Sequence, residues 1–153
     1  MTRKTLILLA AAGSLAMLLG AFGFQYIGGM APCKLCLWQR WPHAAAILIG
    51  GAAYFYRSRA LPYLGALAAL TTAGIGLYHT GIERHWWQGP TTCTSGSVEG
   101  LSTGDLLDQI LAAPVVQCDQ VAWEMFTLSM ASWNMLASLA LALIWIAAAR
   151  RQA

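Results

Sequence analysis

The sequence predicts an all-α membrane protein, a four-transmembrane-helix bundle with a short amphipathic helix on the membrane surface. Of its 153 residues, 58% are hydrophobic and only 10% are charged, whereas a soluble domain carries roughly 25% charged residues. Four segments are also long and apolar enough to cross a bilayer. The chain is too short for a second domain of any size, so we expect one integral membrane domain over residues 1–153. Its basic residues form no contiguous patch, which argues against a nucleic-acid partner.

The expected spans follow from the length that a helix needs to cross about 30 Å of hydrocarbon, which is about 20 residues. The second span would be too short if it began at Pro42. We therefore expect its helix to begin near Cys36 and to bend at Pro42, where proline removes a backbone hydrogen bond. Pro62 is well placed in the first turn of the third span. The four expected spans are residues 5–24, 36–56, 61–79 and 125–149.

A cleaved signal peptide is the alternative interpretation of the first segment, because Arg3 and Lys4 precede its apolar run. The run of about 20 residues exceeds the h-region of such a peptide, which is about 7–15 residues long. Three further spans also follow it. We therefore expect this segment to be retained as a transmembrane helix.

Three groups of basic residues predict the orientation of the chain. They precede the first span, join the second to the third, and follow the fourth, so four spans place them all on one side. The positive-inside rule makes that side cytoplasmic, with both termini. All four cysteines fall on the opposite side, Cys36 at the start of the second span and the other three in the loops at about residues 25–35 and 80–124. In the inner membrane of a bacterium that side is the periplasm, where disulfides persist. The groups are Arg3 with Lys4, Arg57 with Arg59, and Arg150 with Arg151.

The second periplasmic loop is long for a connection without structure of its own. Within it, Ser102 or Thr103 can cap a helix whose leucines and isoleucine share one face, opposite Asp105 and Asp108. We expect this short helix to lie flat on the membrane surface. Packing of the helix on its own loop is the alternative.

A Cys-x-x-Cys motif, Cys33 and Cys36, stands at the start of the second span. The dipole and free amides of a helix N-terminus stabilise a thiolate, and Cys36 occupies that place. Arg40 lies one turn further on the same face, with its Cβ about 6 Å away. A permanent cation at membrane depth is costly unless an anion or polar ligand interacts with it, and a thiolate and a reducible quinone both would. The alternative is an arginine that extends to lipid phosphates.

A second pair, Cys93 and Cys118, lies in the polar loop, where a structural disulfide is the usual outcome. Beside a Cys-x-x-Cys motif, however, thiol–disulfide exchange between two pairs gives electrons a path from an aqueous partner to a membrane acceptor. Four cysteines could instead bind zinc. Because Arg40 would repel the cation and the second pair is widely spaced, we expect no metal.

The run from Pro32 to Arg40, with the sequence PCKLCLWQR, resembles the signature of the DsbB family of bacterial disulfide-bond formation proteins. The resemblance continues through residues 78–83 and 87–90 ahead of Cys93. It resumes after Cys118 with Trp123, Phe126, Ser129, Met130, Ala131 and Asn134. One departure is Thr127, where the family more often has glycine.

The resemblance implies a disulfide-generating thiol:quinone oxidoreductase. It would reoxidise a periplasmic thioredoxin-like dithiol oxidase (DsbA-like) and pass the electrons to the membrane quinone pool, as ubiquinone or menaquinone. Cys93 would be attacked by the partner, and Cys118, released as a thiol, would pass electrons to Cys33. Cys36 would face the quinone, with Arg40 stabilising its thiolate and the reduced quinone.

The resemblance also assigns a role to His79, near the outer end of the third span, which would hydrogen-bond the quinone or move a proton. An ordinary interfacial histidine is the alternative. We expect His43 and His85 to be structural and Asn134 to join helices. Two rival functions stay open: a quinone-linked thiol oxidoreductase of the vitamin K epoxide reductase type, and a membrane zinc-binding or structural protein.

Overall fold

The computed structural model describes residues 1–90, 102–112 and 116–151. Within these ranges the chain is almost entirely helical, with one short hairpin. Cys93 and several turn residues near it lie outside the described residues. The elements in chain order are α1 (Arg3–Tyr26), α2 (Lys34–Phe55), α3 (Ala60–Glu83), α4 (Thr103–Ala112), β1 (Glu124–Met125), β2 (Leu128–Ser129) and α5 (Met130–Arg150).

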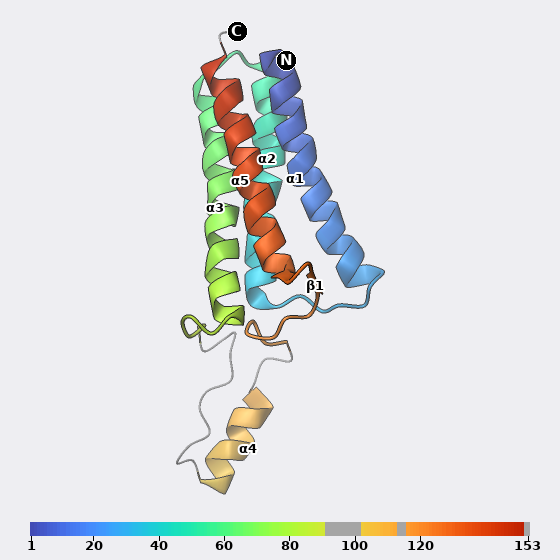
Figure 1. Ribbon diagram of the computed structural model, residues 1–153, viewed down its shortest axis with the longest axis vertical. Coiled ribbons are helices and arrows are strands. Elements are labelled where there is room, and N and C mark those ends of the chain that lie inside the picture. The colour runs from blue at the N-terminus through green and yellow to red at the C-terminus, as the bar shows by residue number, and fades with distance from the viewer. Residues whose placement is uncertain (91–101, 113–115, 152–153) are drawn as a thin grey trace.

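The four long helices pack as a bundle in which α1 and α3 each contact both α2 and α5 (Figure 1). The start of α1 and the end of α5 lie at the same end of this bundle. Toward the other end α1 diverges from its neighbours. In the part of the chain that the structure describes, α1, α3 and α5 are long and apolar enough to cross a membrane. The first half of α2 carries polar residues, and its crossing of the membrane remains a prediction.

The helix boundaries agree with the expected spans at most ends. A side-chain cap begins α2, because the Sγ of Cys33 accepts a hydrogen bond from the backbone N–H of Cys36 at 3.3 Å. This helix continues through Pro42. α3 runs past the expected end at His79 to Glu83. α4 forms at the expected place, and its attachment to a membrane surface remains a prediction.

The expected start of the fourth span at Met125 is wrong. Residues 124–129 instead form an antiparallel hairpin, in which Met125 pairs with Leu128. The two loop residues, Phe126 and Thr127, have φ angles of 52° and 62°, as a type I′ turn requires. Because this segment is largely apolar, the sequence alone makes it look like the first turn of the helix. In the structure the chain turns back on itself here, and the helix begins only after its cap, Ser129.

Close packing at the end with the termini depends on small residues. The Trp145 side chain of α5 is fully buried, and a Cβ added at Gly65 of α3 would lie 2.6 Å from its ring. Likewise, a Cβ at Gly50 of α2 would lie 2.6 Å from the Cβ of Ala11 in α1. Small residues let helix backbones approach closely where packing rather than water exclusion holds helices together. Gly50 and Gly65 therefore allow the four helices to pack closely at this end of the bundle.

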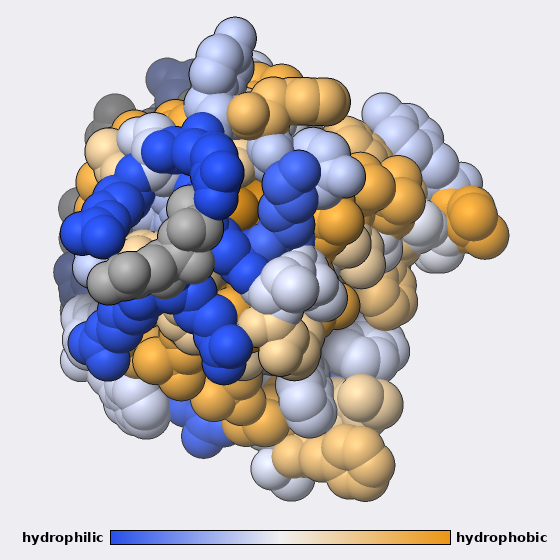
Figure 2. Space-filling model, turned by 90° about the horizontal axis from the view of Figure 1, so that it is seen from above, coloured by the Kyte–Doolittle hydropathy of each residue, from blue (hydrophilic) through white to orange (hydrophobic). Residues whose placement is uncertain are grey.

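Hydrophilic side chains gather over the end of the bundle that carries the start of α1 and the end of α5 (Figure 2). Arg3 is buried there, and its guanidinium donates to the carbonyl of Ser58 at 2.7 Å, which ties α1 to the α2–α3 connection. The exposed basic residues of this end are Lys4, Arg57, Arg59, Arg150 and Arg151. The three groups of basic residues that precede the first expected span, join the second to the third and follow the fourth therefore lie at the end of the bundle opposite the Cys-x-x-Cys motif.

Candidate redox site

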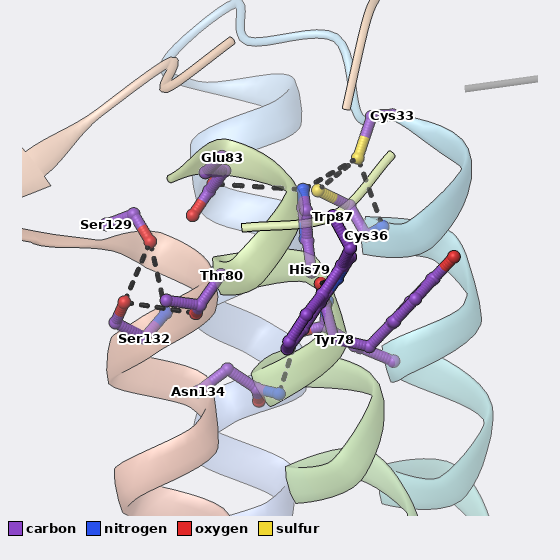
Figure 3. A network of polar contacts seen from close by, with 11 residues as sticks. Cys33, Cys36, Tyr78, His79, Thr80, Glu83, Trp87, Ser129, Ser132 and Asn134 are labelled. Atoms are coloured by element: carbon purple, nitrogen blue, oxygen red, sulfur yellow. Dashed lines mark hydrogen bonds and ion pairs between the residues drawn. The ribbon is translucent and has the colours of Figure 1, made fainter. Parts of the chain in front are cut away.

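The Cys-x-x-Cys pair lies at the end of the bundle where α1 diverges. Both cysteines are free, and the Cys33 thiol donates a hydrogen bond to the Cys36 sulfur at 2.9 Å (Figure 3). This bond, followed by burial, raises the pKa of Cys33 to about 12. Cys33 is therefore the protonated member of the pair, and the Cys36 sulfur is the acceptor at the helix start.

Cys118 joins this pair from the loop before β1. It is fully buried in an apolar cluster with Cys33, Leu35 and Ile82, and Cys36 packs against the same cluster. The structure thus brings together three of the four cysteines predicted as site residues. Cys93 lies outside the described residues, so its pairing with Cys118 remains a prediction.

A buried histidine and carboxylate on α3 lie beside the pair. The Nε2 of His79 is 3.6 Å from the Sγ of Cys33 and 3.7 Å from Oε1 of Glu83 (Figure 3). The extra turn of α3 makes this possible, because it places Glu83 four residues after His79 on the same helix face. Sequence reasoning assigned Glu83 no role, although the i, i+4 spacing was a signal that could have found it.

A chain of side-chain hydrogen bonds leads from His79 into the bundle. Its Nδ1 is 3.1 Å from the amide nitrogen of Gln39, and the Oε1 of Gln39 accepts from Asn134 at 2.7 Å. The Oδ1 of Asn134 is in turn 2.9 Å from Nε2 of His43. All four side chains are buried. Asn134 therefore joins helices as expected, and it does so within a polar network that reaches the cysteines.

Arg40 points across the gap between α2 and α1. Its guanidinium donates to Oε1 of Gln25 at 2.5 Å and to the carbonyl of Ala21 at 3.4 Å. It also lies over the ring of Phe22, 4.8 Å from the centroid. Its Nε is buried and has no hydrogen-bond partner among the residues that the structure describes. Arg40 is thus held by contacts with α1, and its Nε–H stays available as a donor.

The space left by the divergence of α1 is a cavity of about 300 Å³. Its α1 wall is largely apolar, with Met17, Ala21 and Phe24 among the lining side chains. This volume lies at the small end of the range for ligand pockets, about 300–1,000 Å³, and suits a single planar ring. The polar side chains that α2, α3, α5 and the cap of α2 contribute to the lining are Cys33, Cys36, Gln39, Arg40, His43, His79, Glu83 and Asn134.

The same side chains offer ligands for a metal. One ligand atom from each of Cys33, Cys36 and His79 lies within 4.8 Å of the others, so a zinc ion could be held between them. The geometry therefore leaves the zinc alternative open.

Comparisons with known proteins bear on this choice. The family model for "Disulfide bond formation protein DsbB" matches residues 3–148. Disulfide bond formation protein B of Methylococcus capsulatus is 31% identical over 134 residues, which cover 82% of this chain and 81% of the relative. Disulfide bond formation protein B 2 of Pseudomonas aeruginosa is 30% identical over 132 residues, covering 82% and 78%. An uncharacterized protein of Rickettsia prowazekii is 26% identical over 132 residues, covering 84% and 77%. No solved structure matches the chain.

Proposed function

Because the chain belongs to the DsbB family of disulfide bond formation proteins, we propose that it is a thiol:quinone oxidoreductase of the bacterial inner membrane. It reoxidises a periplasmic thioredoxin-like dithiol oxidase and passes the electrons to a membrane quinone. One observation carries the proposal: Cys36 and Arg40 line the same cavity, and Cys33 and Cys118 share a buried cluster behind it.

The proposed electron path runs through two disulfide exchanges and one quinone reduction. The partner's two thiols reduce the Cys93–Cys118 disulfide and leave the partner oxidised. Cys118 then attacks Cys33 in the Cys33–Cys36 disulfide, the Cys36 thiolate leaves, and exchange regenerates the first disulfide. Finally, Cys33 and Cys36 re-form their disulfide. Their two electrons and two protons convert quinone into quinol.

The residues that line the cavity fit a quinone ring. Its apolar wall on α1 suits the ring faces, and the free Nε of Arg40 can donate to a ring oxygen. A charged donor to that oxygen also stabilises the negative charge that develops there during reduction. The quinone, when bound, supplies the two-electron acceptor. Ubiquinone and menaquinone share the ring oxygens on which this fit depends.

His79 acts on the cysteine side of the cavity. Its Nε2 faces both Cys33 and Glu83, so it can donate to the Cys33 thiolate when that thiolate forms. The high pKa of Cys33 makes such help necessary, because only the thiolate attacks sulfur.

A trapping experiment tests the thiol half of the proposal. In Cys118→Ser, the free thiol of Cys93 should attack the disulfide of the oxidised partner and form a mixed disulfide, while the second partner sulfur leaves as a thiol. This adduct should accumulate because no Cys118 thiol is present to displace the partner from Cys93. Cys93→Ser should trap nothing. A stable adduct through Cys118 instead would reverse the roles of these two cysteines.

A second experiment tests the acceptor half and separates the rivals. The purified protein should consume quinone when the reduced partner is added, with one quinone lost per partner disulfide formed. The freshly purified protein should contain two disulfides and no zinc. Stoichiometric zinc with reduced Cys33 and Cys36 would favour the zinc-binding alternative, for which the three clustered ligand atoms are the specific observation.

The orientation is part of the proposal. The end with the exposed arginines faces the cytoplasm by the positive-inside rule, and the cysteines then face the periplasm. Labelling of single cysteines in intact cells tests this. A cysteine placed at Arg57 should be labelled only after the membrane is made permeable.

A further inference from the structure

His43 follows Arg40 by three residues on α2, lines the same cavity, and has a ring nitrogen whose burial the contacts described so far do not explain. Its side chain is 3% exposed, and its Nδ1 is buried without a hydrogen-bond partner in the described part of the chain. His43 also lines the cavity together with Cys36 and Arg40. A buried polar atom without a partner costs free energy unless a ligand or water satisfies it.

The surrounding hydrogen bonds fix which nitrogen of His43 carries its proton. The hydroxyl of Thr72 donates to the carbonyl of Gln39 at 3.2 Å, so its oxygen can only accept from the Asn134 amide nitrogen at 3.1 Å. The amide nitrogen of Asn134 also faces the carbonyl of Thr72, which can only accept. The Oδ1 of Asn134 must therefore face Nε2 of His43.

It follows that neutral His43 carries its proton on Nε2 and donates it to Asn134 at 2.9 Å. Its Nδ1 is then a bare lone pair, which can only accept. This atom differs from the Nε of Arg40, three residues earlier and near the same helix face, which can only donate. Arg40 and His43 both line the cavity, so, within the described ranges, an unpartnered donor and an unpartnered acceptor belong to two of its lining residues.

We propose that the Nδ1 of His43 accepts a hydrogen bond from a hydroxyl of the reduced ring, so that the cavity binds quinol in preference to quinone. This rests on the proposed function, because it assumes that the cavity binds the quinone. A quinone has only acceptor oxygens, and one placed against the bare Nδ1 meets another lone pair. A quinol hydroxyl placed there satisfies the atom.

The consequence is a bias in the direction of electron flow. Tighter binding of the reduced form makes the bound quinone a stronger oxidant of Cys33 and Cys36. A tenfold preference for quinol corresponds to about 30 mV for a two-electron couple. A histidine that served only to hold Asn134 would produce no such preference.

The test measures binding without turnover. In full-length Cys33→Ser/Cys36→Ser protein, the Kd values of short-chain ubiquinone and menaquinone and of their quinols are measured without oxygen by equilibrium dialysis. The readout is the ratio of the quinone Kd to the quinol Kd, in which a general loss of folded protein cancels. His43→Leu should lower this ratio by about 2- to 10-fold, the range for one neutral hydrogen bond.

A second variant tests the same idea while it keeps the imidazole. Asn134→Leu removes the acceptor that fixes the tautomer of His43, so Nδ1 can carry the proton and donate to a quinone oxygen. The ratio should again fall. Ser138→Ala is the matched control, because Ser138 is a fully buried polar residue one turn further along α5 that does not line the cavity. Its ratio should be unchanged.

The outcomes separate this inference from the proposed function. If the reference protein binds both ligand forms but the ratio is unchanged in His43→Leu and Asn134→Leu, the role of His43 is overturned and quinone binding stands. If no quinone and no quinol binds the reference protein saturably, the proposed quinone site is overturned as well.

Discussion

The Nε2 of His79, on α3, lies 3.6 Å from the Sγ of Cys33, the residue that caps the start of α2. Gln39 fixes this arrangement, because its amide nitrogen is 3.1 Å from the other ring nitrogen of His79. The hydrogen bond to Cys36 and burial raise the pKa of Cys33 to about 12, and the contact with His79 opposes that rise. His79 therefore favours the thiolate of Cys33, which is the nucleophilic form of this side chain.

We predict that His79→Leu raises the pKa of Cys33 further. The thiol of Cys33 is neutral and unreactive when protonated, and only its thiolate is alkylated. A higher pKa therefore keeps the unreactive thiol up to a higher pH. At pH 9 the rate of Cys33 alkylation in the reduced protein should fall by about 10- to 150-fold, the range for a hydrogen bond to a charged group. Mass spectrometry of the alkylated peptide as a function of pH measures this.

The control for this experiment is His85→Asn. His85 is exposed after the end of α3 and has a φ of 56°, a conformation that asparagine tolerates. Its replacement should leave the alkylation profile of Cys33 unchanged. An unchanged profile in His79→Leu would instead show that the contact between His79 and Cys33 has no effect on ionisation.

Arg40→Met should weaken quinone reduction while both disulfides still form. Methionine keeps the apolar contact with Phe22 but removes the charged donor, so the apparent KM for quinone should rise by about 10- to 150-fold. Steady-state kinetics with varied quinone measures this. Arg84→Met is the matched control, because Arg84 donates to the carbonyl of Thr127 outside the cavity. Equal kinetics in the two variants would make Arg40 only a structural link to α1.

The hairpin before α5 holds Thr127 in a backbone conformation that favours glycine, the residue expected at this position from the resemblance. Thr127 adopts a φ of 62°, which costs an L-residue about 1–2 kcal/mol, most of all when it is β-branched. Thr127→Gly should therefore raise the free energy of unfolding by about 1 kcal/mol, after the greater backbone freedom of glycine in the unfolded chain is subtracted. Thermal unfolding in detergent measures this, with Thr127→Ala, which stays strained, as control. A Tm of Thr127→Gly at or below the wild-type value would contradict the strain.

The sequence predicted those features that depend on local spacing and hydropathy. The Cys-x-x-Cys pair at a helix start and the arginine one turn later follow from contacts within a few residues, and the structure places Cys33, Cys36 and Arg40 accordingly. The hairpin was missed because Phe126 and Thr127 carry none of the glycine or asparagine signals that normally mark such a turn.

The polar network was missed for a different reason. His43 and Asn134 lie on helices that are far apart in the sequence, and only tertiary packing joins their side chains at 2.9 Å. Each residue alone is a common polar residue in a membrane helix. Their combination with Gln39 and Thr72, which determines the tautomer of His43, is therefore a property of the bundle that local patterns do not reveal.

The Cys33→Ser variant tests whether Cys36 is the sulfur that faces the quinone. Serine is a good helix cap, so the start of α2 should be retained. Cys36 loses its intramolecular partner, and its thiolate should persist at the helix N-terminus in the cavity that it shares with Arg40. A thiolate held against a quinone ring should donate charge to the ring. We therefore predict a visible absorption band that requires quinone.

Three further measurements check the origin of this band. Acidification should bleach it, because protonation removes the charge that the sulfur donates. Cys36→Ser should lack it, and Arg40→Met introduced beside Cys33→Ser should weaken it, since the cation that stabilises both the thiolate and the ring oxygen is gone. A colourless Cys33→Ser protein with quinone demonstrably bound would mean that Cys36 does not face the ring and that the acceptor lies elsewhere than in the cavity beside α1.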